Sequence, residues 1–408
     1  MNKKTILYIT ELFPYPATSG AKIKCINTIQ TLSKKFNITL ICFSEKNVSK
    51  KNLDFVRKFA SHIKVFTLPN LNQPPQDNLR FLIKNYLKLN PYFLYQFYLS
   101  EAKIYLDKLI KKLKPNIIHI DHINMAQYLP KKKNEIWILE EQNIEHQLAW
   151  MKFIHFPDLK KTKLHLLIEY FLVYLFEKRI LKKFDHIFAI SKFDVKIIKN
   201  KFKLNNLSTQ KLVYAPQKSS SKKLAGEGKK RKKEILFIGD ITWLPNKLAI
   251  KWFVKQIFPL ITKKEPKIVL NIVGEIEDEF ANELNYGGKK NIKIHNFQKD
   301  IDKFLNEASI FILPFQAGGG IRLKALTAFS YLLPIVSTPL GVQGIAGRDQ
   351  KEYLLAKKAR EFAKLCLILL KNSNIRKTIG KNGFNYLKNN YSDKNNTIFM
   401  KKYLEVTQ

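Results

Sequence analysis

The chain has 408 residues, enough for two or three domains. Apolar residues make up 45% and charged residues 26%, which is typical of a globular protein and excludes wholesale disorder. The net charge is +39, because 72 lysines and arginines oppose 33 acidic residues. This charge indicates either a lysine-rich, solvated surface or attraction to an anion such as nucleic acid, a phosphorylated substrate or an acidic bilayer.

The cysteines and the apolar runs exclude several further classes of protein. Cys25, Cys42 and Cys366 are far apart and form no C-x-x-C pair, which excludes a disulfide scaffold or a cysteine zinc site and is typical of a reducing cytosol. The first residues lack the pattern of a secretory signal. The longest apolar run, residues 164–176, is too short for a bilayer span, which needs about 20 residues.

Short β-branched runs alternate with helical patterns in the first half of the chain. Helices are predicted at 19–35 and 51–62, and strands at 5–10, 37–43, 63–68, 116–120, 135–140 and 186–190. Continuous apolar strands separated by helices are typical of a parallel sheet covered on both faces. Residues 1–216 are therefore predicted to form an N-terminal Rossmann-like domain.

The second half repeats this layout after a break. Residues 217–233 are polar and basic, which predicts an exposed linker. Strands are then predicted at 234–240, 267–274, 292–297, 309–314 and 334–339, with a helix opened by Pro245. We expect a second Rossmann-like domain at 234–385 and a helical tail from Ala359 that is broken near Gly380 and Gly383. Residues 386–408 are expected to form a helix packing on the N-terminal domain.

The predicted fold class is α/β, with two doubly wound parallel sheets facing across a cleft. Ligands of such sheets bind beyond the carboxyl ends of the strands, so the cleft is the expected site.

A glycine loop in the second half is the most informative segment. A strand ends at Pro314, Gly318, Gly319 and Gly320 follow, and a helix begins with Arg322 and Lys324 in its first turn. Glycines let backbone N–H groups approach a ligand, and a helix start favours anions. Cations are unfavourable in a first turn unless an anion binds there. The segment therefore predicts a phosphate site; the alternative is a plain turn before a solvated helix.

The first predicted strand also leads into a glycine loop, residues 14–24. It has neither G-x-G-x-x-G nor a Walker lysine. Gly20 fits either a ligand approaching the helix start or a simple strand-to-helix turn. Three strands further on, His119 and His122 flank Asp121 at a strand end, which fits a polar cluster facing an acceptor or, alternatively, ordinary loop histidines. Ser191 follows another strand and fits a helix N-cap.

An ordered set of motifs resembles the retaining glycosyltransferases of family 4, in the branch with W-x-P-N and G-G-x-R-x-K patterns. The set comprises SGAKIK, HIDHINMAQYLP, EEQNIE, FDHIFAISKFD, GDITWLPNKLAIKWFVKQIFPLI and the segment 318–341, and it covers nearly the whole chain. The resemblance implies a GT-B fold with a nucleoside diphosphate sugar in the C-terminal domain. It also implies a glycan or lipid-linked acceptor in the N-terminal domain, no metal or other cofactor, and a place in surface polysaccharide or lipopolysaccharide assembly.

The resemblance also assigns roles to residues. Arg322 and Lys324 are the implied catalytic residues, because they would stabilise the departing diphosphate. The remaining implied donor-binding residues are Gly318, Gly319, Gly320, Thr327, Gly239, Asn246, Lys247 and Ser191. The implied acceptor-side residues are Gly20, His122, Gln142 and Glu145.

Two departures from the family pattern leave an alternative open. Many members carry glutamates where this chain has Gly319 and Thr327, and the second of these usually binds the donor ribose. A threonine hydroxyl is shorter and uncharged. The family's H-N-x-E has become Gln142, Asn143, Ile144 and Glu145, and an amide cannot exchange protons. The alternative is a catalytically decayed homologue that acts as a membrane-associated binding or scaffold subunit.

The segment LHLLIEYFLVYLFEKRIL, residues 164–181, could dock on an anionic membrane. Its apolar residues surround the predicted helix, so we expect instead a buried helix packed on the N-terminal sheet. The expected location is cytoplasmic, with peripheral contact at the inner face of the membrane. No nucleic-acid partner is expected, because the aromatic residues lie in apolar runs and not among the basic ones.

Overall fold

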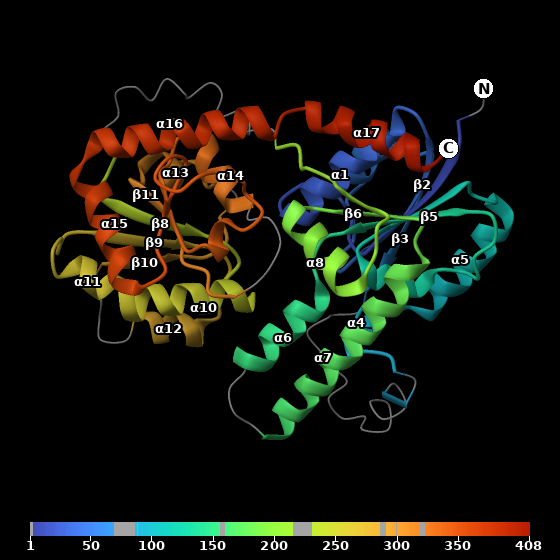
Figure 1. Ribbon diagram of the computed structural model, residues 1–408, viewed down its shortest axis with the longest axis horizontal. Helices are drawn as coiled ribbons and strands as arrows, with labels where there is room; N and C mark the ends of the chain where they lie inside the picture. Colours follow the sequence, from blue (N-terminus) through green and yellow to red (C-terminus); the bar gives the residue numbers. More distant parts are fainter. Residues whose placement is uncertain are drawn as a thin grey trace. The chain divides into compact units, whose positions relative to one another are not determined.

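The structure is a computed structural model that describes residues 3–68, 86–87, 89–155, 160–214, 231–285, 291–298, 300–317 and 323–408. The chain divides into two compact units. Unit 1 comprises Met1–Val213 and Asp393–Gln408, and unit 2 comprises Tyr214–Ser392. Each unit contains one parallel sheet with helices on its faces (Figure 1).

The sheet of unit 1 has seven parallel strands within the described residues, in the order β3-β2-β1-β4-β5-β6-β7. Adjacent strands run in the same direction throughout, which requires a crossover after each strand. The strands are β1 (Thr5–Thr10), β2 (Asn37–Ser44), β3 (His62–Thr67), β4 (Ile117–Asp121), β5 (Ile136–Glu141), β6 (His186–Ala189) and β7 (Leu207–Thr209).

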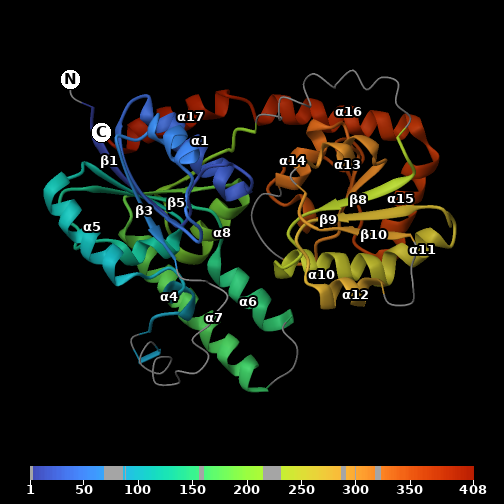
Figure 2. The same ribbon diagram turned by 180° about the vertical axis from the view of Figure 1, so that it is seen from behind.

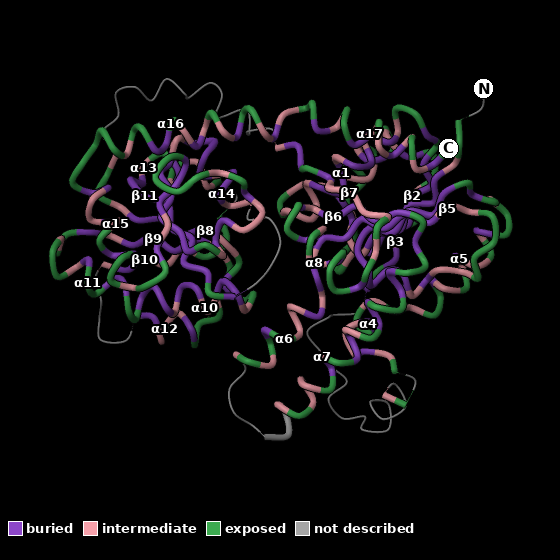
Figure 3. The backbone as a smooth tube through the Cα atoms, viewed as in Figure 1, coloured by how far each residue is buried: buried purple, intermediate pink, exposed green. Residues whose placement is uncertain are grey.

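Two apolar cores cover the two faces of this sheet. One packs α1 (Gly20–Ser33), α2 (Lys50–Arg57) and α17 (Lys394–Val406) against the strands. The other face is covered by α4 (Tyr92–Tyr95), α5 (Ser100–Leu113), α7 (Lys160–Ile180), α8 (Lys192–Phe202) and the 3-10 segment Ile123–Tyr128. Helix α6 (Glu145–His155) packs beside α7 (Figure 2). The central strands are buried from both sides, as Figure 3 shows, whereas the edge strands β3 and β7 are only partly buried.

The C-terminal helix α17 belongs to unit 1 although it follows unit 2 in the sequence. It lies beside α1 and contributes Phe399 and Tyr403 to the core of that face. The Tyr403 ring stacks on His119 of β4, with 5.7 Å between the ring centres. Phe188 of β6 also contacts both Phe399 and Tyr403. These ring contacts hold the C-terminal helix on the sheet of unit 1.

The sheet of unit 2 has six parallel strands within its described residues, in the order β10-β9-β8-β11-β12-β13. Its strands are β8 (Glu234–Ile238), β9 (Val269–Val273), β10 (Ile292–His295), β11 (Ile310–Leu313), β12 (Ile335–Ser337) and β13 (Leu354–Leu355). Its helices are α10 (Leu244–Trp252), α11 (Phe258–Thr262), α12 (Asp278–Asn285), α13 (Asp302–Glu307), α14 (Leu323–Ser330), α15 (Ala359–Lys371) and α16 (Ser373–Asn390). A π-helical turn, Phe253–Ile257, joins α10 to α11.

The predicted helix break at Gly380 and Gly383 is wrong, because α16 runs through both residues. The glycines serve close packing instead. A Cβ atom on Gly380 would lie 2.1 Å from the carbonyl oxygen of Leu332, and one on Gly383 would lie 2.4 Å from the Phe329 ring. Glycine at these two positions therefore lets α16 approach α14 and the turn after it.

The predicted α/β class with two Rossmann-like sheets is confirmed. Several local expectations differ. The predicted helix at 51–62 ends at Arg57, and β7, β13 and α5 were not predicted. Arg231, at the end of the expected linker, is half-buried and donates to the carbonyl oxygens of Leu305, Ala308 and Tyr331. Among the described residues, no helix is both long and apolar enough to cross a bilayer.

Candidate functional site

In unit 2, the sheet order changes direction between β8 and β11. Strands β9 and β10 extend the sheet on one side of β8, and β12 and β13 extend it on the other side of β11. Helices that follow adjacent strands leave on opposite faces at such a switch point, and the crevice at the carboxyl ends is where doubly wound sheets bind ligands. Gly239 directly follows β8, and Lys324 lies in the first turn of α14, which follows β11.

Lys324 is held at this edge by a defined set of contacts. Its Nζ atom donates to the side-chain oxygen of Asn246 at 2.6 Å. It also lies 4.9 Å from the centre of the Phe237 ring and 5.4 Å from that of Phe315, within the range of cation–π attraction. Asn246 is fixed in turn, because it donates to the carbonyl oxygen of Asp240. The ammonium group is thus positioned at the switch point by two strands and two helices.

Gly239 makes room for this ammonium group. A Cβ atom at residue 239 would lie 2.0 Å from Lys324 Nζ and 3.2 Å from the Asn246 amide nitrogen. The backbone of Gly239 is also close to that of Gly274, whose φ of +147° favours glycine. Small residues at both positions let the cation sit directly against the backbone that follows β8.

The other donor-side residues are placed differently. Lys247 pairs with Glu277 at 2.5 Å and lies 5.0 Å from the centre of the Phe280 ring. Its ammonium group therefore contacts the start of α12. The Thr327 hydroxyl bonds the Tyr214 hydroxyl at 2.8 Å and donates to Leu323 O at 3.2 Å. Gly318, Gly319, Gly320 and Arg322 lie outside the described residues.

Unit 1 has its own polar cluster at the corresponding edge. Thr10 ends β1, Asp121 ends β4, and Glu140 lies opposite Asp121 in β5, so the three residues are neighbours in register. The Thr10 hydroxyl donates to Asp121 at 2.9 Å, and the Gln142 amide donates to the other oxygen of the same carboxylate at 2.6 Å. This is again the switch point of the sheet, between β1 and β4.

A buried lysine balances these carboxylates. Lys24 of α1 pairs with Glu140 at 2.9 Å, and neither side chain is more than 6% exposed. Burial alone would raise the pKa of Glu140, but Lys24 and His119 hold it below its usual range. Burial and the nearby Glu140 charge raise the pKa of Asp121. Two neighbouring carboxyl groups thus have pKa values shifted in opposite directions, a pattern that often accompanies a functional site.

His119 does not join a cluster facing an acceptor, which was one of the two expectations from the sequence. It is fully buried, it stacks on Tyr8 with 4.4 Å between ring centres, and its Nδ1 bonds the Tyr403 hydroxyl at 3.1 Å. The side chain lies in the core under α17, where its Nε2 is 3.3 Å from Glu140 Oε2, so His119 packs in the core and supports that carboxylate from the buried side.

His122, in contrast to His119, lies in the polar cluster at the carboxyl edge of the unit 1 sheet. It follows β4 with φ +79°, a left-handed conformation that is strained for a residue with a side chain. Its ring lies between two carboxylates, 3.7 Å from Glu11 and 3.3 Å from Glu145. Burial would lower the pKa of His122, but Glu11 and Glu145 raise it above its ordinary value. The imidazole therefore carries a proton more readily than a free histidine.

Glu141 is the carboxyl group of this cluster whose ionised form is most disfavoured by its surroundings. It ends β5, it is buried, and it lies near Glu145 and Glu177. Burial and these two carboxylates raise the pKa of Glu141 well above its ordinary value. The raised pKa favours the protonated form of Glu141, which can donate as well as accept a hydrogen bond.

The remaining predicted residues fall into two groups. Gln142 and Glu145 join His122 at the carboxyl edge of unit 1, as the Asp121 and His122 contacts show. Gly20 is the first residue of α1, after the N-cap Ser19. Ser191 caps α8 and bonds Asp194 at 2.5 Å, so its hydroxyl is engaged within unit 1.

Sequence reasoning missed Lys24, Glu11, Glu140 and Glu141 as members of this site. One signal was available, since a pair of glutamates at the end of an apolar strand is unusual. Parallel strands place their carboxyl ends at one edge, so the polar ends of β1, β4 and β5 had to meet. The described residues contain no group of three or more histidine, cysteine or acidic side chains arranged to hold a metal ion.

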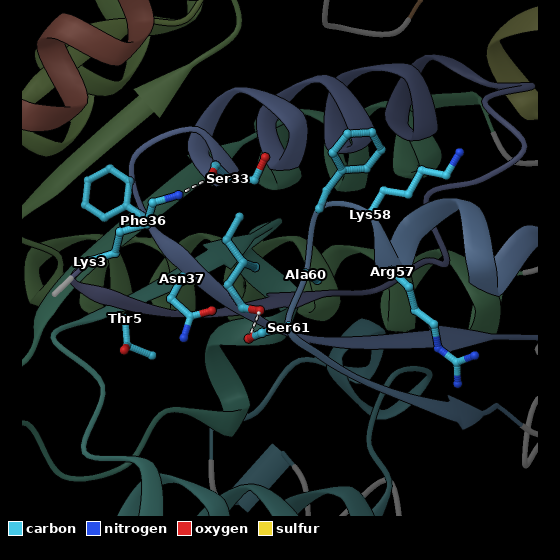
Figure 4. A pocket seen from close by; sticks show the side chains of 11 residues that line it. Lys3, Thr5, Ser33, Phe36, Asn37, Arg57, Lys58, Ala60 and Ser61 are labelled. Atoms are coloured by element: carbon cyan, nitrogen blue, oxygen red, sulfur yellow. Dashed lines mark hydrogen bonds between the residues drawn. The ribbon is translucent and has the colours of Figure 1, made fainter.

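Two surface hollows lie at the opposite edge of the unit 1 sheet. One, of about 660 Å³, is lined by residues that include Thr5, Asn37, Arg57 and Ser61, as Figure 4 shows. The other is lined in part by Asn116 and Ile136. Thr5, Asn37 and Ile136 begin their strands, so both hollows face the amino ends of the sheet. Since sheets of this kind bind ligands at their carboxyl ends, we assign neither hollow to the site.

Comparison with known protein families gives a match within the second unit. Residues 232–372 match the family described as glycosyl transferases group 1. An uncharacterized 44.6 kDa protein in the cps region of Klebsiella pneumoniae is 28% identical over 167 residues, which are 39% of this chain and 43% of that protein. The uncharacterized glycosyltransferase MJ1069 of Methanocaldococcus jannaschii is 29% identical over 281 residues, 64% of this chain and 67% of that one. The chain thus spans less than half of the Klebsiella protein that it matches.

Solved structures extend the likeness in fold to the whole chain. A glycosyltransferase from Rickettsia africae has a TM-score of 0.62 at 16% identity, covering 100% of this chain and 98% of that one. Anabaena Alr3699/HepE, solved in complex with UDP and glucose, has a TM-score of 0.62 at 11% identity, covering 98% and 99%. The family match is thus confined to residues 232–372, and the solved structures show the fold of the whole chain. The two Rossmann-like units together have the GT-B fold.

Proposed function

We propose that the protein transfers a sugar from a nucleoside diphosphate sugar to a glycan or lipid-linked acceptor, with retention of configuration at the sugar. The observation that carries this proposal is the position of Lys324, whose ammonium group is held by Asn246 at the switch point of unit 2. HepE, which shares the fold, binds UDP and glucose, and we extend that donor class to this chain.

The charge at this edge suits a departing diphosphate. Breaking the bond between sugar and phosphate leaves negative charge on the diphosphate, and a cation fixed in advance stabilises that charge without reorganisation. The N-terminus of α14 adds backbone N–H donors at the same end. Arg322, two residues before Lys324, is proposed as the second cation. With two cations and a helix start, the leaving group needs no metal ion.

The carboxyl edge of unit 1 suits an acceptor hydroxyl. His122, Glu11 and Glu145 offer a proton-exchanging ring and two hydrogen-bond acceptors in one place. Gln142 donates to Asp121 and in this role orients a carboxylate, a function that does not require a histidine. For retention, the sugar is attacked from the face that the phosphate leaves, and the departing phosphate oxygen takes the acceptor proton. Loss of the family's histidine at Gln142 is compatible with that step.

The experiment is a turnover assay of the full chain across UDP- and GDP-sugars. Release of the nucleoside diphosphate is measured with and without glycan and lipid-linked acceptors, and NMR of the product reports the anomeric configuration. We expect release with at least one donor and its loss in Arg322→Ala and Lys324→Ala, while Lys247→Ala remains active. Failure to bind any nucleotide sugar would favour the alternative, a GT-B homologue that acts as a scaffold subunit.

A further inference from the structure

One face of α7 exposes four large apolar side chains. Leu164 is 61% exposed, Ile168 36%, Phe171 54% and Leu175 44%. Successive spacings of four, three and four residues place them in one stripe along the helix, which extends over roughly 16 Å. The expected buried helix packed on the N-terminal sheet is therefore buried on one face only. That face is buried at Leu172 and Val173 and joins the core of unit 1 through Phe176, and the exposed face has no such core partner among the described residues.

Helix α6 widens this apolar surface. Trp150 and Ile154, one helical turn apart, are 44% and 51% exposed. The Trp150 ring lies 5.1 Å from that of Tyr170, so the two helices pack together and extend side by side from the sheet of unit 1 (Figures 1 and 2). We call the exposed residues of the two helices, Trp150, Ile154, Leu164, Ile168, Phe171 and Leu175, the docking face. Apolar patches of this kind on a soluble protein mark an interaction surface.

The acidic residues of these helices are turned away from the docking face. Glu169 accepts hydrogen bonds at 2.9 Å from the backbone N–H groups of Tyr92 and Phe93 at the start of α4. Glu177 accepts from Glu145 N at 2.8 Å and from His146 N at 3.1 Å at the start of α6. Both carboxylates are buried, and each stabilises the N-terminus of another helix.

The basic residues are turned outward. Lys178 and Arg179 are exposed just beyond Leu175, at the C-terminal end of the apolar stripe. The C-terminal end of the apolar stripe is therefore basic, while Glu169 and Glu177 are engaged away from it. An anionic surface complements this basic end, and the whole chain carries a net charge of +39.

We propose that the docking face binds the surface of an anionic phospholipid bilayer. The apolar stripe and Trp150 enter the boundary between head groups and acyl chains, and the flanking cations contact the phosphates. Because Glu169 and Glu177 tie α7 to α4 and α6, the helix lies in the plane of the membrane surface. Binding of this kind goes beyond the proposed sugar transfer and does not depend on it.

The test is flotation of the full chain with vesicles of phosphatidylcholine, with and without phosphatidylglycerol. We expect co-flotation only with the anionic vesicles, weakened by salt. The double variant Phe171→Glu, Leu175→Glu should partition roughly tenfold less or worse. The control is Ile104→Glu, Ile398→Glu, which adds the same charge at two exposed apolar positions, 57% and 64% exposed, on other helices of unit 1. Equal binding by the two double variants would overturn the proposal.

Tryptophan fluorescence gives a second readout that needs no charged substitution. Trp150 should shift to shorter wavelength when anionic vesicles are added, and Trp150→Phe should lose that shift. Trp243→Phe, which removes an exposed tryptophan of unit 2, should keep it. A shift that persists in Trp150→Phe would contradict the assignment. Reversible dimerisation of the free protein that is abolished by Phe171→Glu, Leu175→Glu would also overturn it, in favour of a second copy. Vesicle binding without sugar transfer would leave this proposal intact and contradict only the proposed function.

Discussion

Lys324 donates to the side-chain oxygen of Asn246 across 2.6 Å, which joins the start of α14 to the start of α10. The two residues come from helices that follow different strands, β11 and β8, and they meet only because those strands are neighbours at the switch point. The contact is with a neutral amide oxygen, so Asn246 positions the ammonium group without itself supplying a negative charge.

Gly239→Ala tests whether the space beside this pair matters. The new Cβ would displace Lys324 Nζ, which is the mobile end of a long side chain, so we expect only a small loss of stability. Affinity for UDP or GDP should fall roughly tenfold, because a charge-assisted contact is weakened. Calorimetric titration measures the affinity, and thermal denaturation measures the stability.

Gly380→Ala is the matched control for that substitution. Its Cβ would meet the backbone carbonyl of Leu332, which cannot move aside, so stability should fall. The folded fraction should retain normal nucleotide affinity. The account of Gly239 is wrong if the two alanine variants change affinity equally.

Thr327→Glu distinguishes an adapted residue from a decayed one. We expect Thr327 to be adapted to its place in this fold, because its hydroxyl forms a hydrogen bond with the Tyr214 hydroxyl. A glutamate would break that bond and place negative charge in the helix that carries Lys324, so donor binding and turnover should decrease. Tyr214→Phe serves as control, with a loss of about 1 kcal/mol of stability from the missing hydrogen bond. Stronger donor binding in Thr327→Glu would support the scaffold alternative.

Glu141 should make the protein less stable as the pH rises. Because the folded state holds the Glu141 proton at a pKa well above the ordinary value, the unfolded chain releases that proton first. From this residue alone, the free energy of unfolding is highest below the ordinary glutamate pKa. It falls by roughly 1.4 kcal/mol per pH unit above it, until the raised folded pKa is reached.

Glu141→Gln should remove that slope. We expect the variant to gain stability over the parent at about pH 8 and to gain much less at about pH 5, measured from urea denaturation midpoints. The same gain at both pH values would indicate a packing effect. No gain at either pH would contradict the raised pKa of Glu141.

Tyr403 tests whether the C-terminal helix stabilises unit 1. The side chain is fully buried against Phe188 and Phe399 and bonds His119. Tyr403→Ala should cost about 3–5 kcal/mol, and Tyr403→Phe about 1 kcal/mol. Emission of the buried Trp137 reports unfolding of unit 1, and that of the buried Trp252 reports unit 2. Loss of stability confined to the Trp252 transition would contradict the placement of α17.

The alternation of apolar strands and helices was sufficient to predict both sheets, because continuous β-branched runs have one stable arrangement in a doubly wound fold. The shortest strands, β7 and β13, escaped prediction because three or two residues carry no period. Gly380 was misread for a different reason. Glycine in a helix can mark a break or a close approach, and only the position of Leu332 distinguishes the two.

The sequence likewise predicted only some residues of the candidate site. The position of Lys324 at the edge of unit 2 follows from the chain order. His122, Gln142 and Glu145 lie together at the carboxyl edge of unit 1, and their acceptor-side role stays a prediction. Lys24 was not predicted, because its position on the buried side of α1 depends on the packing of that helix over Glu140. The exposed stripe of α7 was missed for the same reason, since sequence alone did not reveal which side of an all-apolar helix lacks a partner.

The most direct test of the central claim, that the switch point of unit 2 binds a diphosphate, is calorimetric titration of UDP and GDP into the full chain, into Lys324→Ala and into Lys247→Ala. The account predicts binding of at least one nucleotide, a loss of roughly ten- to hundredfold in Lys324→Ala, and affinity near that of the parent in Lys247→Ala, whose charge is paired with Glu277. Unchanged affinity in Lys324→Ala, or equal loss in the two variants, would contradict it.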